Sequence, residues 1–197
     1  MLASISPLGE RARNNLWWLT VGAYALSSTA AGAAAGAMAG LIGKVLIGRS
    51  PHTAALYASM ALACLAAAGW DAGGRALPPR RQVNEDWLAS YRGWIYGAGF
   101  GAQLGAGVTT VITTALVPLT FALALGLADP APAALTGASF GLVRALPVLA
   151  LYRVTTPEKL RRVHVRMQGA AGTARALAMA SALIVGGFLL TDAVLST

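Results

Sequence analysis

The sequence predicts an all-α protein, a polytopic transmembrane helix bundle of about five spans with additional interfacial amphipathic helices. Of its 197 residues, 56% are hydrophobic and only 11% are charged, whereas a soluble domain carries about 25% charged residues. The charged residues are also clustered, which leaves long uncharged runs, and a hydrocarbon core of about 30 Å needs about 20 apolar helical residues. We therefore expect residues 1–197 to form a single integral membrane domain.

The spans follow the uncharged runs of the chain. We place them at about 16–42, 52–70, 95–127, 132–152 and 173–194. With the N-terminus in the cytoplasm, this arrangement puts nearly all arginines and lysines on the inner side, as the positive-inside rule requires. The net charge of +8 then reflects topology rather than nucleic-acid binding, and we expect a multi-pass protein of a bacterial cell (plasma) membrane.

The first span begins after Arg11 and Arg13 with the stretch LWWLTVGAYALSS. This order resembles a secretory signal, so cleavage is an alternative. The uncharged run continues to Gly43, however, which favours an uncleaved span. We expect Trp17 and Trp18 to anchor it at the headgroup level, where aromatic rings are enriched.

The third run, residues 93–128, is too long for one simple span. As one helix it would extend about 54 Å, so we predict a long or broken helix that bends near Pro118. A hairpin of two shorter helices stays open. Before it, Asn84 is a candidate N-cap of an interfacial helix that would carry Trp87 and Trp94 on one face.

A basic amphipathic helix is predicted between the last two spans. Thr156 is a suitable N-cap and Pro157 suits the first helical position. We expect this helix to lie on the inner leaflet against anionic headgroups, with docking of a cytoplasmic partner as the alternative. Its cations are Lys159, Arg161, Arg162 and Arg166.

Glycines recur every fourth residue in two of the spans. A dinucleotide-binding loop would need a strand before the glycines, and none is predicted, so we interpret these stripes as helix-packing faces. Packing within the chain, in a homo-oligomer or against another membrane protein stays open. The stripes are Gly93, Gly97, Gly101 and Gly105 in the third span, and Gly32, Gly36 and Gly40 in the first.

One ionisable residue lies deep within a predicted span. Arg144 is nine residues before Arg153, or about 13 Å from the inner edge, and an intramembrane charge is a functional hypothesis by default. Gln103, Ser27 and Ser28 are expected at comparable depth, so the four would form a substrate-binding site for a carboxylate or phosphate. The alternative is that Arg144 snorkels toward the inner surface, or that helix carbonyls and Gln103 satisfy it.

Enzyme and metal patterns are incomplete. The stretch GASFG at 137–141 resembles the serine motif of rhomboid-type intramembrane proteases, which implies a nucleophilic Ser139. The last span has no histidine to serve as its base. His52 and His164 are predicted on opposite sides of the membrane, so we expect no metal site, no cofactor and no enzyme activity.

The predicted layout, with glycine-broken helices and polar groups at midplane, is similar to that of small bacterial transporters of the CcdA/DsbD and LysE kinds. Cys64 is the single cysteine, so the paired cysteines of the CcdA type are absent. The resemblance implies a small inner-membrane transporter or permease, here for an anionic small molecule. The alternative is a non-catalytic membrane subunit or scaffold that packs through its glycine stripes and docks a partner at its cytoplasmic basic loops.

Overall fold

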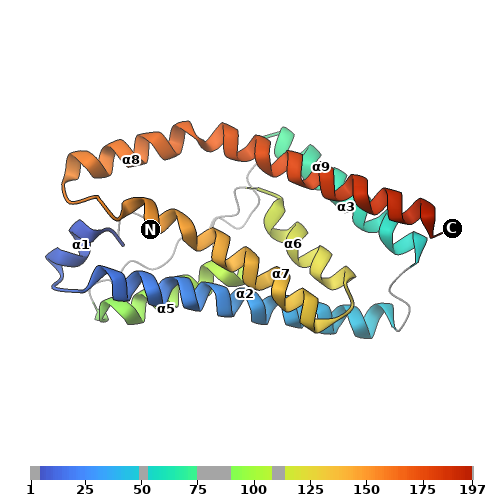
Figure 1. The fold of residues 1–197 in the computed structure, drawn as a ribbon, viewed down its shortest axis with the longest axis horizontal. Coiled ribbons are helices and arrows are strands. Elements are labelled where there is room, and N and C mark those ends of the chain that lie inside the picture. The colour runs from blue at the N-terminus through green and yellow to red at the C-terminus, as the bar shows by residue number, and fades with distance from the viewer. Residues whose placement is uncertain (1–4, 49–52, 75–89, 108–113, 197) are drawn as a thin grey trace. The chain divides into compact units, whose positions relative to one another are not determined.

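A computed structural model describes residues 5–48, 53–74, 90–107 and 114–196, and this part of the chain is mainly helical and contains no strand (Figure 1). The helices are α1 (Pro7–Ala12), α2 (Trp17–Ile47), α3 (Ala54–Ala72), α5 (Gly93–Ala106), α6 (Leu116–Gly126), α7 (Pro130–Ala145), the 3-10 helix η1 (Leu146–Leu151), α8 (Pro157–Gly169) and α9 (Ala171–Leu195).

Four of the described segments are long and apolar enough to cross a membrane, namely α2, α3, α7 together with η1, and α9. They match the first, second, fourth and fifth predicted spans within a few residues. Large apolar side chains on them are exposed, such as Leu26 (74%), Leu135 (70%) and Phe188 (71%). Length, composition and exposed apolar surface are those of a multi-pass membrane protein.

The third predicted span is not one helix. A break was expected near Pro118, and α6 begins at Leu116, two residues before that proline. Helix α5 ends at Ala106, where Gly107 takes a left-handed conformation with φ 70°, a C-cap that glycine adopts at little steric cost. Pro118 is tolerated in the first turn of α6. The 14 residues of α5 and 11 of α6 are each shorter than the roughly 20 that a span needs, and the connection lies outside the described residues.

The expected helix that would run continuously from Asn84 through Trp94 is interrupted. Arg92 is extended, with φ −64° and ψ 152°, and α5 begins at Gly93. Asn84 and Trp87 lie outside the described residues. The prediction that Trp87 and Trp94 share one helix face therefore falls outside the described residues.

The chain divides into two compact units, with boundaries after residues 33, 80, 110, 137 and 171. The first unit contains α1, the first half of α2, α5, the end of α7, η1 and α8. Its core includes Trp17, which is 8% exposed and donates its indole N–H to the carbonyl of Ile5 (3.2 Å). The prediction of Trp17 as a surface anchor is therefore wrong, because its ring is buried and hydrogen-bonded to Ile5. Trp18, in contrast, is 66% exposed.

The second unit contains the remainder of α2, α3, α6, the start of α7 and α9. Helix α3 packs on α6 around a core that includes Cys64 and Leu119. The buried carboxylate of Asp71 accepts a hydrogen bond from the backbone N–H of Ala115 (2.7 Å). It thereby satisfies an amide at the start of α6 that has no helical partner.

Candidate functional site

The α5 glycine stripe lies against the backbone of α2. All four glycines are buried. A Cβ on Gly97 would lie 2.6 Å from the carbonyl oxygen of Thr20, and a Cβ on Gly101 or Gly105 would collide with the carbonyl of Tyr24 or Ser28. The two helices therefore approach so closely, in matched four-residue steps, that only glycine fits on α5.

Gly36 and Gly40 of α2 form a corresponding close approach in the second unit. A Cβ on Gly40 would lie 2.6 Å from the carbonyl oxygen of Asp129, and one on Gly36 would collide with the carbonyl of Ala133 in α7. Gly32 is also buried. The α5 stripe, and Gly36 and Gly40 of the α2 stripe, thus face other parts of the same chain.

Arg144 lies where α7 meets α5 in the first unit. Its Nη1 donates to the carbonyl of Leu104 (3.0 Å), and its guanidinium stacks on the ring of Phe140, 5.2 Å from the centroid. The neighbour of Leu104 on α5 is Gln103, which is partly buried. The arginine thus links two helices through a backbone carbonyl, which corresponds to the predicted alternative of a carbonyl-satisfied charge.

The two serines also donate to backbone carbonyls. Ser28 is fully buried, and its hydroxyl donates to Gly141 of α7 (2.7 Å). Ser27 donates to Tyr24 in its own helix (3.1 Å). Gly141, which accepts the hydrogen bond from Ser28, lies one turn before Arg144 on α7. Of the four predicted substrate-binding residues, Arg144 and Ser28 therefore lie at one junction of α2, α5 and α7.

A buried polar cluster around Glu10, which the sequence reasoning missed, joins α1 to α2 and α5 (Figure 1). Glu10 is fully buried. One carboxylate oxygen, Oε1, accepts from Arg13 (2.6 Å) and from the hydroxyl of Tyr96. The other, Oε2, accepts from Thr20 (2.9 Å). A buried carboxylate is costly unless it is paired and hydrogen-bonded, and here both oxygens have donors.

Arg13 is the positive partner in this cluster. Burial alone would lower the pKa of Arg13, but its hydrogen bonds to Glu10 and Tyr96 outweigh this effect and raise it. The guanidinium also lies 5.6 Å from the centroid of the Tyr96 ring. Arg13 therefore remains a guanidinium cation beside Glu10, with 2.6 Å between Nη2 and Oε1.

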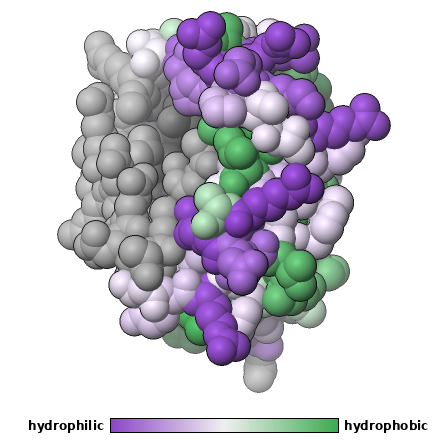
Figure 2. Space-filling view, turned by 90° about the vertical axis from the view of Figure 1, so that its left-hand side faces the viewer, coloured by the Kyte–Doolittle hydropathy of each residue, from purple (hydrophilic) through white to green (hydrophobic). Residues whose placement is uncertain are grey.

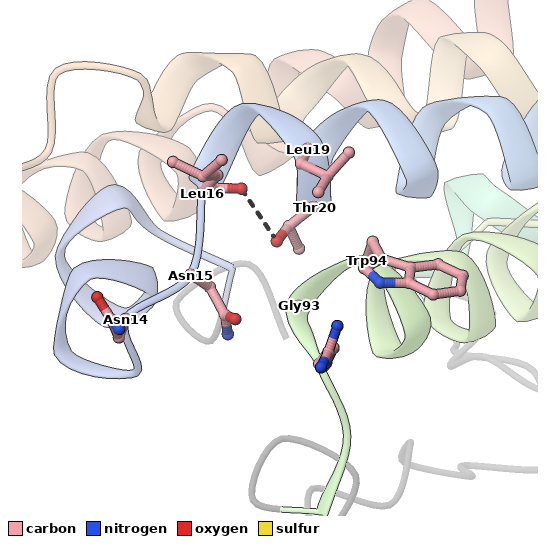
Figure 3. A pocket seen from close by; sticks show the side chains of 8 residues that line it. Asn14, Asn15, Leu16, Leu19, Thr20, Gly93 and Trp94 are labelled. Carbon is pink, nitrogen blue, oxygen red and sulfur yellow. Dashed lines mark hydrogen bonds between the residues drawn. The ribbon is translucent and has the colours of Figure 1, made fainter.

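A cavity of about 340 Å³ lies beside this cluster, where α2 and α5 begin. Figure 3 shows Asn14 and Asn15 on one side of it and Trp94 on the other, with Thr20 between them. The remaining lining residues are Leu16, Leu19, Arg92 and Gly93. A Cβ on Gly93 would lie 2.5 Å from Thr20 Oγ1 and 2.9 Å from Glu10 Oε2, so a glycine is required at this wall.

Helix α8 begins as the sequence predicts. Thr156 is the N-cap and accepts from the backbone N–H of Lys159 (3.4 Å), and Pro157 occupies the first turn. Hydrogen bonds from its own backbone N–H and from Thr156 lower the pKa of Glu158. These hydrogen bonds stabilise the ionised carboxylate. Their contribution to the stability of the helix start is therefore present at neutral pH and is lost in acid, as pH falls through the lowered pKa.

The cations of α8 point away from the rest of the chain. No residue of α8 is buried, and all four predicted cations are exposed. Within α8, the only partly buried residues are Leu160, Val163 and Met167. The helix packs against η1. Figure 2 shows many hydrophilic side chains over this end of the first unit.

Ser139 and His164, the described residues of the incomplete protease and metal patterns, lie on different helices, α7 and α8. Ser139 is exposed on α7, while Gly141 beside it is buried against the carbonyl of Ser28. His52 lies outside the described residues, and His164 contacts Gln168 on α8 (3.0 Å). Within the described ranges, no three His, Cys, Asp or Glu side chains gather as a metal site would need.

The Glu10 cluster and the cavity were missed because each depends on residues far apart in the sequence. One local signal was present: Ser6 and Pro7 begin a helix, and Glu10 is the only acidic residue among the first 70. This signal predicts α1. Glu10 and Tyr96 are 86 residues apart, and no local sequence pattern predicts that they are in contact.

No protein-family model, curated protein or solved structure matches this chain.

Proposed function

We propose that this protein is a non-catalytic membrane subunit that holds an acidic partner protein at the membrane through α8. The observation that carries the proposal is the exposed basic surface of α8. Arg161, Arg162 and Arg166 line a groove of about 440 Å³ with Val165 and a single acid, Glu158. Val165 is 61% exposed, which supplies an apolar contact among the charges.

The packing of α8 favours a partner over the lipid surface. A helix that lies on the leaflet buries its apolar stripe in lipid. Here the stripe residues Leu160, Val163 and Met167 are already partly covered by the chain, while the cations face outward. Complementary charge steers association and is sensitive to salt, so the complex should form readily at low ionic strength.

The test compares two variants of the full chain in native-membrane nanodiscs. Replacing the four cations (K159Q/R161Q/R162Q/R166Q) should reduce the co-purifying acidic protein about tenfold or more, because each lost charge weakens the contact. The matched control, K159R/R161K/R162K/R166K, keeps every charge and should retain the partner. Quantitative mass spectrometry of the purified nanodiscs measures both.

A second readout separates this proposal from binding to headgroups. An environment-sensitive dye on His164→Cys reports the surroundings of α8, because the single native cysteine, Cys64, is buried. We expect its emission to be the same in anionic and zwitterionic nanodiscs. A blue shift in anionic lipid, or partner binding retained in the glutamine variant, would contradict docking.

Transport of an anionic small molecule is a second candidate, because Arg144 and Ser28 meet at one junction within apolar helices. If Arg144 binds substrate, an anion should raise the thermal stability of the wild type in detergent and have no effect on Arg144→Met. The control is Arg153→Met, an exposed arginine of the same unit, which should keep the response. If no small anion stabilises the wild type, or if Arg144→Met responds equally, this candidate is excluded.

A further inference from the structure

We propose that the cavity at the starts of α2 and α5 binds the headgroup of an anionic phospholipid. The lining of this cavity has two parts with different chemistry. Arg92, Asn14 and Asn15 supply a positive charge and two amides, which suit phosphate oxygens. The other part is apolar and is formed by Leu16, Leu19 and Trp94.

The apolar part distinguishes a lipid from a soluble anion. Leu16 is 75%, Leu19 55% and Trp94 48% exposed, so these side chains continue from the cavity onto the outer surface. A free phosphate has no apolar group that could pack against these side chains. An acyl chain that leaves the cavity over this surface would cover it, and burial of apolar area is favourable.

The cavity floor is held in place before any ligand binds. The Thr20 hydroxyl is held by Glu10 (2.9 Å) and lies 3.4 Å from the carbonyl of Leu16, and the backbone N–H of Asn15 donates to the carbonyl of Glu10 (2.9 Å). The negative charge of the nearby Glu10 carboxylate is offset by its ion pair with Arg13 (2.6 Å). Arg92 therefore remains the dominant charge at the cavity.

The position along the helices fits a headgroup. Helix α2 is long and apolar enough to cross a membrane and begins at Trp17, so residues 14–20 include the end of this candidate span. Trp18, in the first turn of α2, is 66% exposed, and tryptophan favours the headgroup level. The first amides of α5 add a partial positive charge, since its N-cap has no side-chain hydrogen bond.

The experiment measures binding of defined lipids to the full chain in detergent, by native mass spectrometry and thermal shift. The three probes are dioctanoyl phosphatidylglycerol, dioctanoyl phosphatidylcholine and glycerol phosphate. We expect saturable binding and stabilisation by the first. The zwitterionic lipid should bind about tenfold more weakly or worse, and glycerol phosphate should have no effect at equal concentration.

Two variants and one control locate the binding. Arg92→Gln removes the cation, and Asn14→Asp places a negative charge in the cavity at a position with φ 57° that aspartate tolerates. Each should weaken phosphatidylglycerol binding about tenfold. Arg11→Gln removes an exposed cation that does not line the cavity and should change binding less than about twofold.

Four results would overturn the proposal. Equal binding of both lipids would show that the anionic headgroup is not recognised. Stabilisation by glycerol phosphate alone would make the ligand a soluble anion. An equal loss in Arg11→Gln would indicate diffuse attraction rather than a site. Unchanged binding in both Arg92→Gln and Asn14→Asp would exclude this cavity, and the thermal stability without lipid shows that each variant is folded.

Discussion

Gly105→Ala should destabilise the protein by about 1–3 kcal/mol, which is the usual cost of overpacking. The new Cβ would collide with the carbonyl oxygen of Ser28 and lie 2.7 Å from its carbonyl carbon. Backbone atoms of α2 cannot move aside as a flexible side chain would, so α5 must shift away from α2. Thermal unfolding of the full chain in detergent measures the effect.

The matched control is Gly22→Ala, in the helix that α5 packs against. A Cβ at Gly22 would meet nothing within 4 Å. Because alanine is the better helix former, this change should be neutral or stabilise by about 0.5–1 kcal/mol. The two substitutions are chemically identical, so their difference isolates the close approach. If Gly105→Ala also stabilises, α5 does not pack on α2 in this register.

Glu10→Ala should destabilise the protein by about 3 kcal/mol, because it removes one partner of a largely buried ion pair. Three donors lose their acceptor at once: Arg13, Thr20 and Tyr96. The helix α1 should then separate from α2 and α5. Thermal unfolding measures the loss, and faster proteolysis after Arg11 and Arg13 in the folded protein reports the release of α1.

Two comparisons sharpen this result. Glu10→Gln keeps an acceptor but loses the charge, so its effect should fall between that of alanine and the wild type. Glu158→Ala removes an exposed carboxylate at the start of α8 and should destabilise the protein much less than Glu10→Ala, because solvent screens an exposed charge. Equal effects of the alanine substitutions at Glu10 and Glu158 would mean that the Glu10 cluster does not hold α1.

Composition and periodicity determined most of the helices. The uncharged runs predicted α2, α3, α7 with η1, and α9 within a few residues, because the length of apolar chain is a local property. Thr156 and Pro157 likewise predicted the start of α8, since a cap acts on amides within one turn. The four-residue glycine period in α5 predicted a face without side chains.

Only the tertiary structure decided which surface meets that face. The carbonyls of Thr20, Tyr24 and Ser28 lie against the α5 glycines, and carbonyls are the same in every residue, so no sequence signal marks them. Arg144 bonds to a carbonyl for the same reason. Trp17 turned inward because Ile5 offers an acceptor, and Glu10 is buried because Arg13, Thr20 and Tyr96 converge on it. The sequence by itself determined where the apolar helices run, and packing decided which polar groups hold them together, because those partners come from distant parts of the chain.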